Sequence, residues 1–402
     1  MARFLVVGGG IGGLATALSL SRHGHEAVVL ERNDTFAELG AGIQLAANGI
    51  RALDELGLGA PVRARARAID HLRFMDGVSG EHVTSMPLTE TYRRRFGNPY
   101  VVVHRGELHR MLHDAVRATG RVELRAQQHV TGYHRDEGSA TAVLETGERV
   151  TGDVLIGADG VRSAVRRQLV GDGDPRNSGI TVYRSLVPIE RVPPELRWNA
   201  VTWWAGPGCH FVHYAIAGGR FLNMAASFDD RATRVVSGVP VPAATVRGLF
   251  TALAEAPRRL LALGADWRAW VLIDRPPVQD WTDGRVALLG DAAHPMLHYA
   301  AQGACQALED AVVLGALSAG RTDGFAPMLR EYNAHRRERT AAVQRVSLES
   351  IRLWHPVGPA AHARNARLAA LTSDELHDHV AWMHHIPKFS RILESSESGR
   401  TP

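Results

Sequence analysis

The 402-residue sequence is almost without lysine: Lys388 is the single one, so 45 of its 46 basic side chains are arginine. It has only two cysteines, Cys209 and Cys305, too few for a disulfide framework or a four-thiolate metal site. No apolar run approaches the roughly 20 residues that span a bilayer, and the N-terminus enters a strand pattern at once instead of a signal peptide. We therefore expect a cytoplasmic protein with no membrane span.

The excess of arginine gives a formal net charge of +4, and a basic chain suggests a nucleic-acid partner. Such proteins gather basic side chains and interleave them with aromatic ones. Here the arginines are scattered and often lie beside acids, as in 330–339 (REYNAHRRER). We expect no nucleic-acid partner, and the mild positive field suits a small anionic ligand. The charge run at 92–95 (YRRR) is interpreted as solvent-exposed surface, and steering of an anionic substrate or of the NADH phosphate is the alternative.

Changes in the hydrophobic pattern divide the chain into four parts. Residues 1–173 and 281–350 contain short buried-strand patterns and helices, which is typical of an α/β domain built from two pieces. Residues 174–280 lose helical periodicity and alternate like antiparallel strands. The tail, 351–402, is predicted to be helical with a frayed end. The expected fold is α/β with an inserted β-sheet domain.

A glycine-rich turn follows the first predicted strand, at residues 3–8. In the pattern Gly8-x-Gly10-x-x-Gly13, the glycines allow a tight turn, a close approach of pyrophosphate to the backbone, and close packing of helix on strand. Glu31 ends the next strand, at the distance where an acid accepts a ribose hydroxyl. The unit predicts a dinucleotide with a free 2′-hydroxyl, such as FAD or NAD.

Two acidic turns follow later strand patterns. Asp159-Gly160 ends the segment VLIGADG, and Gly290-Asp291 follows GRVALLG. An aspartate at the carboxyl end of a strand lies where ligands bind in open α/β sheets. Taken alone, the Asp159 motif is better explained as a turn before an N-capped helix, whereas for Asp291 a helix N-cap is the less favoured interpretation.

These three motifs, in this order, resemble those of the single-component FAD-dependent aromatic hydroxylases, the class A flavoprotein monooxygenases. Residues 40–58, 104–108 (HRGEL) and 290–311 most resemble the subgroup of 3-hydroxybenzoate 6-hydroxylase, salicylate hydroxylase and 6-hydroxynicotinate 3-monooxygenase. The resemblance implies the para-hydroxybenzoate hydroxylase type of fold. In that fold a Rossmann-like FAD-binding domain is interrupted by a mostly antiparallel substrate-binding sheet, and helices follow at the C-terminus.

The resemblance also implies a tightly bound, non-covalent FAD and the residues that hold it. Arg105 is implied to contact the FAD phosphate or ribityl chain, Asp291 a ribityl hydroxyl, and Asp159 the neighbourhood of FAD and NADH. Pro295 is implied to lie beside the isoalloxazine ring. The full implied set is Gly8, Gly10, Ile11, Gly12, Gly13, Glu31, Arg32, Ile43, Arg105, Val130, Asp159, Asp291, Pro295, Gly303 and Ala304. A helix that starts near Gly303 and Ala304 also favours the anionic reduced flavin, because a helix N-terminus stabilises negative charge.

The inserted domain is expected to hold the substrate through the segment CHFVHYAI. On a strand, His210 and Tyr214 point to one face and His213 to the other. The resemblance implies that His210 and Tyr214 touch the hydroxyl and the carboxylate of an aromatic ring, and that Gln302 joins His210 at the hydroxyl. A histidine is a suitable base for a phenol. That His210 and Tyr214 are ordinary sheet residues stays open, and His213 is expected to be structural.

The implied reaction is hydroxylation of a small phenolic carboxylate by NAD(P)H and O2 through a flavin C4a-hydroperoxide, as in 3-hydroxybenzoate 6-hydroxylase. Decarboxylative hydroxylation of the salicylate type, or hydroxylation of a related heteroaromatic acid or biosynthetic intermediate, stays open, as does NADH against NADPH. The chain has no second GxGxxG unit, in agreement with transient binding of the nicotinamide coenzyme. The helix-rich C-terminal third offers a contact for a homodimer.

The scarcity of lysine excludes one other flavin enzyme. Flavin-dependent halogenases share the FAD fold but need a lysine in the first third of the chain and a WxWxIP segment. The single lysine here is Lys388, and Trp267 and Trp270 have the wrong spacing.

Histidines at helical spacing do not predict a metal site. His109 and His113 are four residues apart, as are His294 and His298, but neither pair has a third ligand in a zinc pattern. The histidine-rich residues 377–385 are interpreted as a solvent-exposed helix face.

Overall fold

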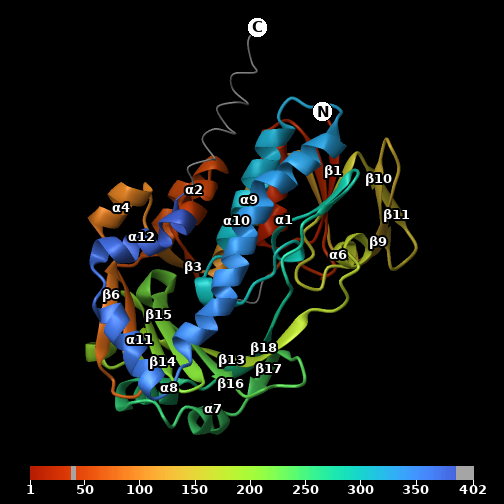
Figure 1. Ribbon diagram of the computed structural model, residues 1–402. Coiled ribbons are helices and arrows are strands. Elements are labelled where there is room, and N and C mark those ends of the chain that lie inside the picture. The colour runs from red at the N-terminus through yellow and green to blue at the C-terminus, as the bar shows by residue number, and fades with distance from the viewer. Residues whose placement is uncertain (38–41, 386–402) are drawn as a thin grey trace.

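The apolar run at the N-terminus forms a central strand of a six-stranded, largely parallel sheet in the computed structural model, which describes residues 1–37 and 42–385 (Figure 1). The strand order is β19-β20-β12-β1-β2-β8, and only β19 is antiparallel to its neighbour. The strands are β1 (Arg3–Val7), β2 (Glu26–Leu30), β8 (Val122–Arg125), β12 (Val154–Gly157), β19 (Thr282–Asp283) and β20 (Val286–Leu288). The expected nucleotide-binding sheet in two pieces is therefore present.

Three helices place the glycine turn and connect the two halves. Helix α1 (Ile11–Arg22) follows β1 and packs against α9 (Gly303–Ser318), while α10 (Phe325–Trp354) runs from this half of the molecule to the other (Figure 1). Helices α9 and α10 follow each other along the chain, separated by a turn with two glycines at 319–324.

The inserted part forms an eight-stranded sheet in the order β17-β18-β13-β16-β15-β14-β5-β6, antiparallel except between β14 and β5. Sequence reasoning did not find β5 and β6, which enter this sheet from the first part of the chain. The strands are β5 (His71–Asp76), β6 (His82–Pro87), β13 (Arg176–Pro188), β14 (Ala200–Gly206), β15 (Cys209–Ile216), β16 (Phe221–Asp229), β17 (Ser237–Val241) and β18 (Trp267–Asp274).

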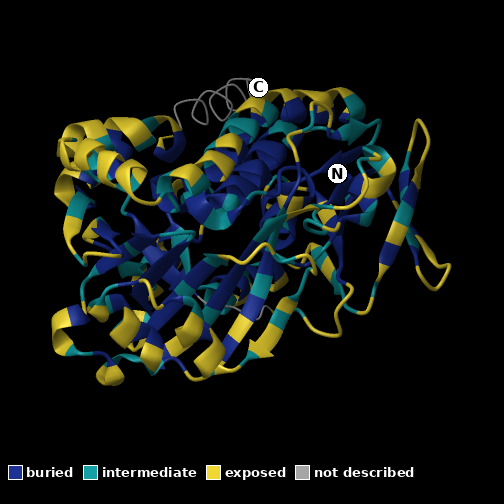
Figure 2. Ribbon diagram, turned by 60° about the horizontal axis from the view of Figure 1, so that its bottom comes forward, coloured by how far each residue is buried: buried dark blue, intermediate teal, exposed yellow. Residues whose placement is uncertain are grey.

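The central strands of the two sheets are buried (Figure 2), and the remaining elements lie around them. Two three-stranded sheets are formed by β3 (Gly42–Leu45), β4 (Arg67–Ala68) and β7 (Val101–His104), and by β9 (Val130–Arg135), β10 (Ala140–Leu144) and β11 (Arg149–Gly152). The other helices are α2 (Ala47–Glu55), α3 (Gly59–Arg65), α4 (Glu90–Phe96), α5 (Arg105–Ala118), α6 (Ala164–Leu169), α7 (Ala243–Leu249), α8 (Glu255–Leu263), α11 (Pro359–Ala369) and α12 (Ser373–His384). Within the described ranges, none of the helices is long and apolar enough to cross a membrane.

The expectation of an exposed histidine-rich face holds for His379 and His385 but was wrong for His377 and His384. His377 and His384 are buried where α12 packs on α4 and β6. His377 Nε2 donates to the carbonyl of Pro87 at 2.7 Å, and His384 Nδ1 lies 2.9 Å from the Tyr92 hydroxyl. Tyr92 is itself fully buried, so of the run at 92–95 only the three arginines are exposed. The predicted frayed end lies beyond residue 385, outside the described residues.

Candidate cofactor and substrate site

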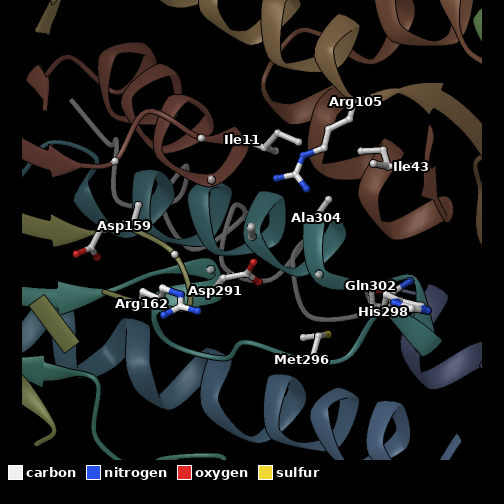
Figure 3. Close-up of a pocket in the computed structure, with 18 of the residues that line it drawn as sticks. Ile11, Ile43, Arg105, Asp159, Arg162, Asp291, Met296, His298, Gln302 and Ala304 are labelled. Carbon is white, nitrogen blue, oxygen red and sulfur yellow. The ribbon is translucent and has the colours of Figure 1, made fainter. Parts of the chain in front are cut away.

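A cavity of about 550 Å³ lies between the two large sheets (Figure 3). One wall is formed by the carboxyl ends of β1 and β12 and the start of α1, and the other by side chains of β13, β15 and β16. All but two of the residues predicted for the site line this cavity. The lining residues that were predicted are Gly8, Gly10, Ile11, Gly12, Glu31, Arg32, Ile43, Arg105, Val130, Asp159, His210, Tyr214, Asp291, Gln302, Gly303 and Ala304. Residues from all three motifs therefore meet in one space.

The two predicted residues outside the lining are Gly13 and Pro295. A Cβ on Gly13 would lie 1.9 Å from the carbonyl oxygen of Gly8, so this glycine lets α1 approach β1. The carbonyl of Pro295 accepts a hydrogen bond from Gln344 Nε2 at 3.0 Å, and Met296 lines the cavity instead.

Two helices begin at the cavity without a side-chain cap. The residues before α1 and α9, Gly10 and Gln302, make no side-chain cap hydrogen bond, although both line the cavity. The first N–H groups of a helix have no partner within it, and they attract phosphate and other anions. Arg32 and Arg105 add positive charge along the same lining. This donor set fits a dinucleotide with a pyrophosphate at α1 and an electron-rich ring at α9.

The predicted acids of the cavity are oriented by backbone amides. Glu31 accepts from the N–H of Gly9 at 2.7 Å and of Asn33 at 2.9 Å, which holds its carboxylate at the end of β2. Asp159 accepts from Ser163 Oγ and from the N–H of Ala164, so part of its role is to fix the turn before α6. Burial raises the pKa of Asp159, while the hydrogen bonds from this turn oppose the shift.

The sheet register explains which side chains reach the substrate end of the cavity. His210 lies opposite Ser227, and Tyr214 opposite Asn223, all on the face that lines or borders the cavity. His213 points to the other face, where its ring lies 5.4 to 6.5 Å from those of Phe211, Trp198 and Trp204. The alternation along β15 is therefore as expected.

His210 is enclosed by aromatic rings and by a second histidine. Its Nδ1 lies 2.9 Å from Nε2 of His355, and the rings of Tyr299 and Trp354 lie 5.0 and 5.6 Å away. Burial, together with the neighbouring His355 and His298, holds the pKa of His210 well below its usual value. The imidazole is therefore neutral. In the tautomer in which Nδ1 donates to His355, its Nε2, which has no hydrogen-bond partner among the described residues, can accept a hydrogen bond from a ligand.

Tyr214 and Arg184 differ in what they can offer a ligand. The Tyr214 hydroxyl donates to the carbonyl of Gly42 at 2.8 Å, and burial raises its pKa to about 12. Arg184 extends from β13 opposite Ala225, and both line the cavity. No acid or hydrogen-bond acceptor in the described part of the chain pairs with Arg184, whose guanidinium carbon is 5.9 Å from the Trp270 ring centroid. Arg184 thus brings an uncompensated positive charge to the cavity.

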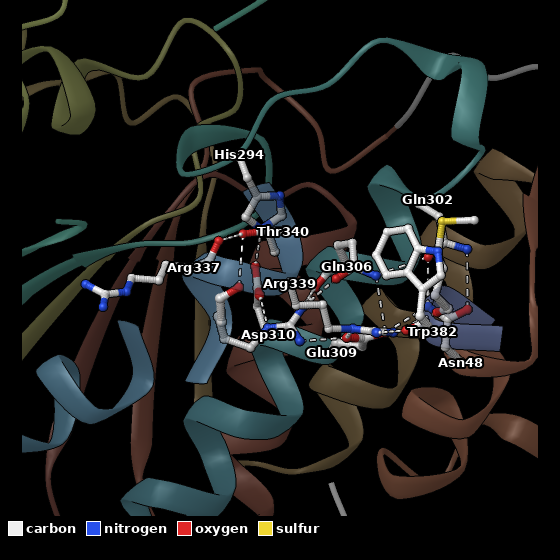
Figure 4. Close-up of polar contacts among 12 residues, drawn as sticks. Asn48, His294, Gln302, Gln306, Glu309, Asp310, Arg337, Arg339, Thr340 and Trp382 are labelled. Atoms are coloured by element: carbon white, nitrogen blue, oxygen red, sulfur yellow. Dashed lines mark hydrogen bonds and ion pairs between the residues drawn. The ribbon is translucent and has the colours of Figure 1, made fainter. Parts of the chain in front are cut away.

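Behind Gln302 lies a fully buried ionic network (Figure 4). Arg336 donates to Glu309 at 2.6 Å and to Asp310 at 2.7 Å, and Nε2 of His294 lies 2.6 Å from Asp310. Burial alone would raise the pKa of Asp310, but the charges of His294 and Arg336 outweigh it and lower this pKa to about 2. Both carboxylates are therefore ionised inside the protein.

The histidines considered for a metal have other partners. His109 Nε2 donates to the carbonyl of Gly9 at 2.8 Å, and His294 pairs with Asp310. Among the residues that the structure describes, no group of three His, Cys, Asp or Glu is arranged to hold a metal ion.

Sequence reasoning missed several lining residues: Arg184, Trp203, Val212, Asn223, Ala225, Met296, Leu297, His298, Tyr299 and Trp354. The alternation that singled out His210 extends to Asn223 and Arg184 once the pairing of β15, β16 and β13 is known. Trp354 gives no such signal, because it arrives from the end of α10.

The comparisons with known proteins agree with this geometry. Residues 1–187 and 260–347 match the family described as "FAD binding domain". The chain is 44% identical to 3-hydroxybenzoate 6-hydroxylase 1 of Aquipseudomonas alcaligenes, over 94% of this chain and 96% of that one. It is 30% identical to 6-hydroxynicotinate 3-monooxygenase of Bordetella bronchiseptica, over 86% and 90%.

Solved structures show the same fold. A substrate complex of salicylate hydroxylase superposes with a TM-score of 0.84 at 24% identity, over 98% of both chains. HpxO of Klebsiella pneumoniae, complexed with FAD and uric acid, gives a TM-score of 0.81 at 27% identity, over 99% of this chain and 97% of that one.

Proposed function

The chain belongs to the family of FAD-dependent aromatic hydroxylases, and on this basis we propose that it hydroxylates a small phenolic carboxylate such as 3-hydroxybenzoate, using NAD(P)H and O2. The observation that carries the proposal is one cavity in which the nucleotide turn meets a neutral imidazole, a buried amide and Arg184, which has no pairing partner among the described residues. A phenolic acid presents one group for each: a ring hydroxyl for His210 and Gln302, and a carboxylate for Arg184.

FAD fits the residues of the cavity on structural grounds. A Cβ on Gly8 would lie 2.4 Å from the carbonyl of Ala158, so only glycine leaves this turn as tight as it is. Gly10 and Gly12 would hold the pyrophosphate at the start of α1, Glu31 the ribose, and Asp291 and Ala304 the flavin side. When bound, FAD supplies the transfer of electrons from NAD(P)H to O2 and of one oxygen atom to the ring.

The protein's own contribution starts with the phenolic proton. In the proposed pose the hydroxyl donates to Nε2 of His210, whose Nδ1 is 2.9 Å from His355. His355 is half-buried, but its Nδ1 is buried and has no hydrogen-bond partner among the described residues, so the pair ends inside the protein. Withdrawal of the proton increases the electron density of the ring, which favours attack on an electrophilic oxygen.

Arg184 would hold the carboxylate, because Tyr214 already donates its hydroxyl to Gly42. We expect Arg184→Met to raise KM for 3-hydroxybenzoate by about 10- to 100-fold, with a much smaller change in kcat, since a charged hydrogen bond is lost from substrate binding. Steady-state kinetics with the holoenzyme measure both constants.

The matched control is Arg268→Met. Arg268 is exposed and lies on β18, directly opposite Arg184 on β13. This variant should leave KM unchanged. Binding of 3-methylphenol, which has no carboxylate, should be equally weak in the wild type and in Arg184→Met. An unchanged KM for 3-hydroxybenzoate in Arg184→Met would exclude Arg184 from carboxylate recognition.

The function is tested by a screen of phenolic acids for stimulated NAD(P)H oxidation, with identification of the product. We expect 3-hydroxybenzoate to give a dihydroxybenzoate that keeps its carboxylate. Formation of CO2 from salicylate would support the decarboxylative alternative, and a colourless protein without FAD would refute both. A cytoplasmic location and a homodimer stay predictions, and the choice between NADH and NADPH stays open. Sedimentation of the holoenzyme tests whether it is a homodimer.

A further inference from the structure

Three amides and a carboxylate form a chain behind the substrate end of the cavity (Figure 4). Oε1 of Gln302 accepts hydrogen bonds from Asn48 Nδ2 at 2.8 Å and from Gln306 Nε2 at 3.1 Å. The same two NH2 groups donate to Oε1 of Glu309, at 2.7 and 3.3 Å. All four side chains are buried. Because Asn48, Gln306 and Glu309 are closed off from solvent and only Gln302 lines the cavity, the orientation of each amide depends on its neighbours.

Glu309 determines which way two of these amides face. Arg336 Nη1 and Arg339 Nε donate to its Oε2 at 2.6 and 2.8 Å, and these charges outweigh burial and lower its pKa. An ionised carboxylate only accepts hydrogen bonds. Asn48 and Gln306 must therefore turn their NH2 groups towards Glu309. Arg336 holds Gln306 from its other end, because Nη2 donates to Gln306 Oε1 at 2.8 Å.

The orientation of Gln302 follows from these two contacts. Two NH2 groups meet at its Oε1, and a reversed Gln302 would bring three NH2 groups together in a buried site. Its Nε2 gives one N–H to Asn48 Oδ1 at 3.4 Å. The second N–H has no acceptor among residues 1–37 and 42–385, and Gln302 lines the cavity. The cavity therefore receives a donor at this point.

We propose that Glu309 is a positioning residue that makes the enzyme prefer a phenol to an aniline. Through Asn48 and Gln306 it fixes Gln302 so that an N–H, and never the amide oxygen, faces the substituent held beside His210. This inference rests on the proposed function, which places the substrate's hydroxyl there. A hydroxyl or phenolate oxygen accepts this hydrogen bond, whereas an aromatic NH2 group acts mainly as a donor and opposes it.

The test is binding of three acids to the oxidised holoenzyme without NAD(P)H: 3-hydroxybenzoate, 3-aminobenzoate and benzoate, each followed by the change in flavin absorbance. In the wild type, 3-hydroxybenzoate should bind at least about tenfold more tightly than 3-aminobenzoate. In Glu309→Gln the uncharged side chain allows Asn48 and Gln302 to reverse. The hydroxyl-to-amino preference should then fall about tenfold, while the affinity for benzoate changes less than about twofold.

Asn48→Leu is the second variant, because it removes one donor to Gln302 without uncovering a charge, and it should lower the preference in the same direction. Glu338→Gln removes an equal charge at an exposed position of α10 and should leave all three affinities unchanged. An equal loss of affinity for all three ligands in Glu309→Gln, or an unchanged preference in either of the first two variants, would overturn the role of Glu309. A wild type that binds none of the three would refute the proposed function and this assignment with it.

Discussion

Replacing His210 with asparagine is expected to lower the rate of ring hydroxylation by about 10²- to 10⁴-fold, the contribution usual for a general base. Asparagine places a polar atom near the position of Nδ1, so the contact with His355, 2.9 Å in the wild type, is kept. It removes Nε2, to which the phenolic proton is proposed to pass. FAD should stay bound, because His210 lies on the sheet side of the cavity and α1 on the opposite side.

The measurement is the fraction of NADH oxidation that yields hydroxylated product, with the remainder appearing as hydrogen peroxide. His213→Asn is the matched control, since His213 lies on the same strand but faces a cluster of tryptophan and phenylalanine rings. It should lower stability and leave the product fraction near that of the wild type. Full product yield from His210→Asn would remove this histidine from the reaction.

The nucleotide half of the site was predictable because its chemistry depends on neighbours in sequence. The turn from Gly8 to Gly13 needs small residues at fixed spacing, and Glu31 follows one helix and one strand later. The alternation of CHFVHYAI separated His210 from His213 in the same way, since the side chains of a strand alternate between its faces. Local geometry decides each of these positions.

Other parts of the site depend on contacts that no local pattern contains. His355 meets His210 across a separation of 145 residues, because α10 carries it from the nucleotide half to the eight-stranded sheet. Arg184 lies in a strand whose pairing partners are remote in sequence, so nothing local distinguishes it from a surface arginine. The burial of His377 has the same cause: α4 and β6 cover a helix that its composition marked as polar.

The arginine-rich composition hides one position with a structural role that lysine could not fill. Arg336 is buried and divides its guanidinium group between two carboxylates, with Nη1 on Glu309 and Nε on Asp310. Bridging two carboxylates from separate nitrogens in this way needs the planar fork of arginine. We expect Arg336→Met to lower the free energy of unfolding by about 3–5 kcal/mol, because it leaves two buried carboxylates with fewer compensating charges.

Urea unfolding of the FAD-loaded protein measures this loss. Arg337→Met is the matched control, since Arg337 is half-buried and forms no ion pair within the described residues; it should change stability by less than about 0.5 kcal/mol. A loss of the same size in both variants would mean that the arginine side chains stabilise α10 by packing alone.

The pH dependence separates the charge effect from packing. In the wild type the pKa of Asp310 is lowered from 3.8 to about 2, so its contribution to stability is present above about pH 4 and is lost as the pH falls towards 2. In Arg336→Met one of the two neighbouring cations is gone, the pKa of Asp310 rises, and acid unfolding begins at a higher pH. The difference in stability between wild type and variant should therefore be largest near neutral pH and narrow below pH 4. A constant difference across this range would show that lost packing, and not the uncompensated carboxylates, destabilises the variant.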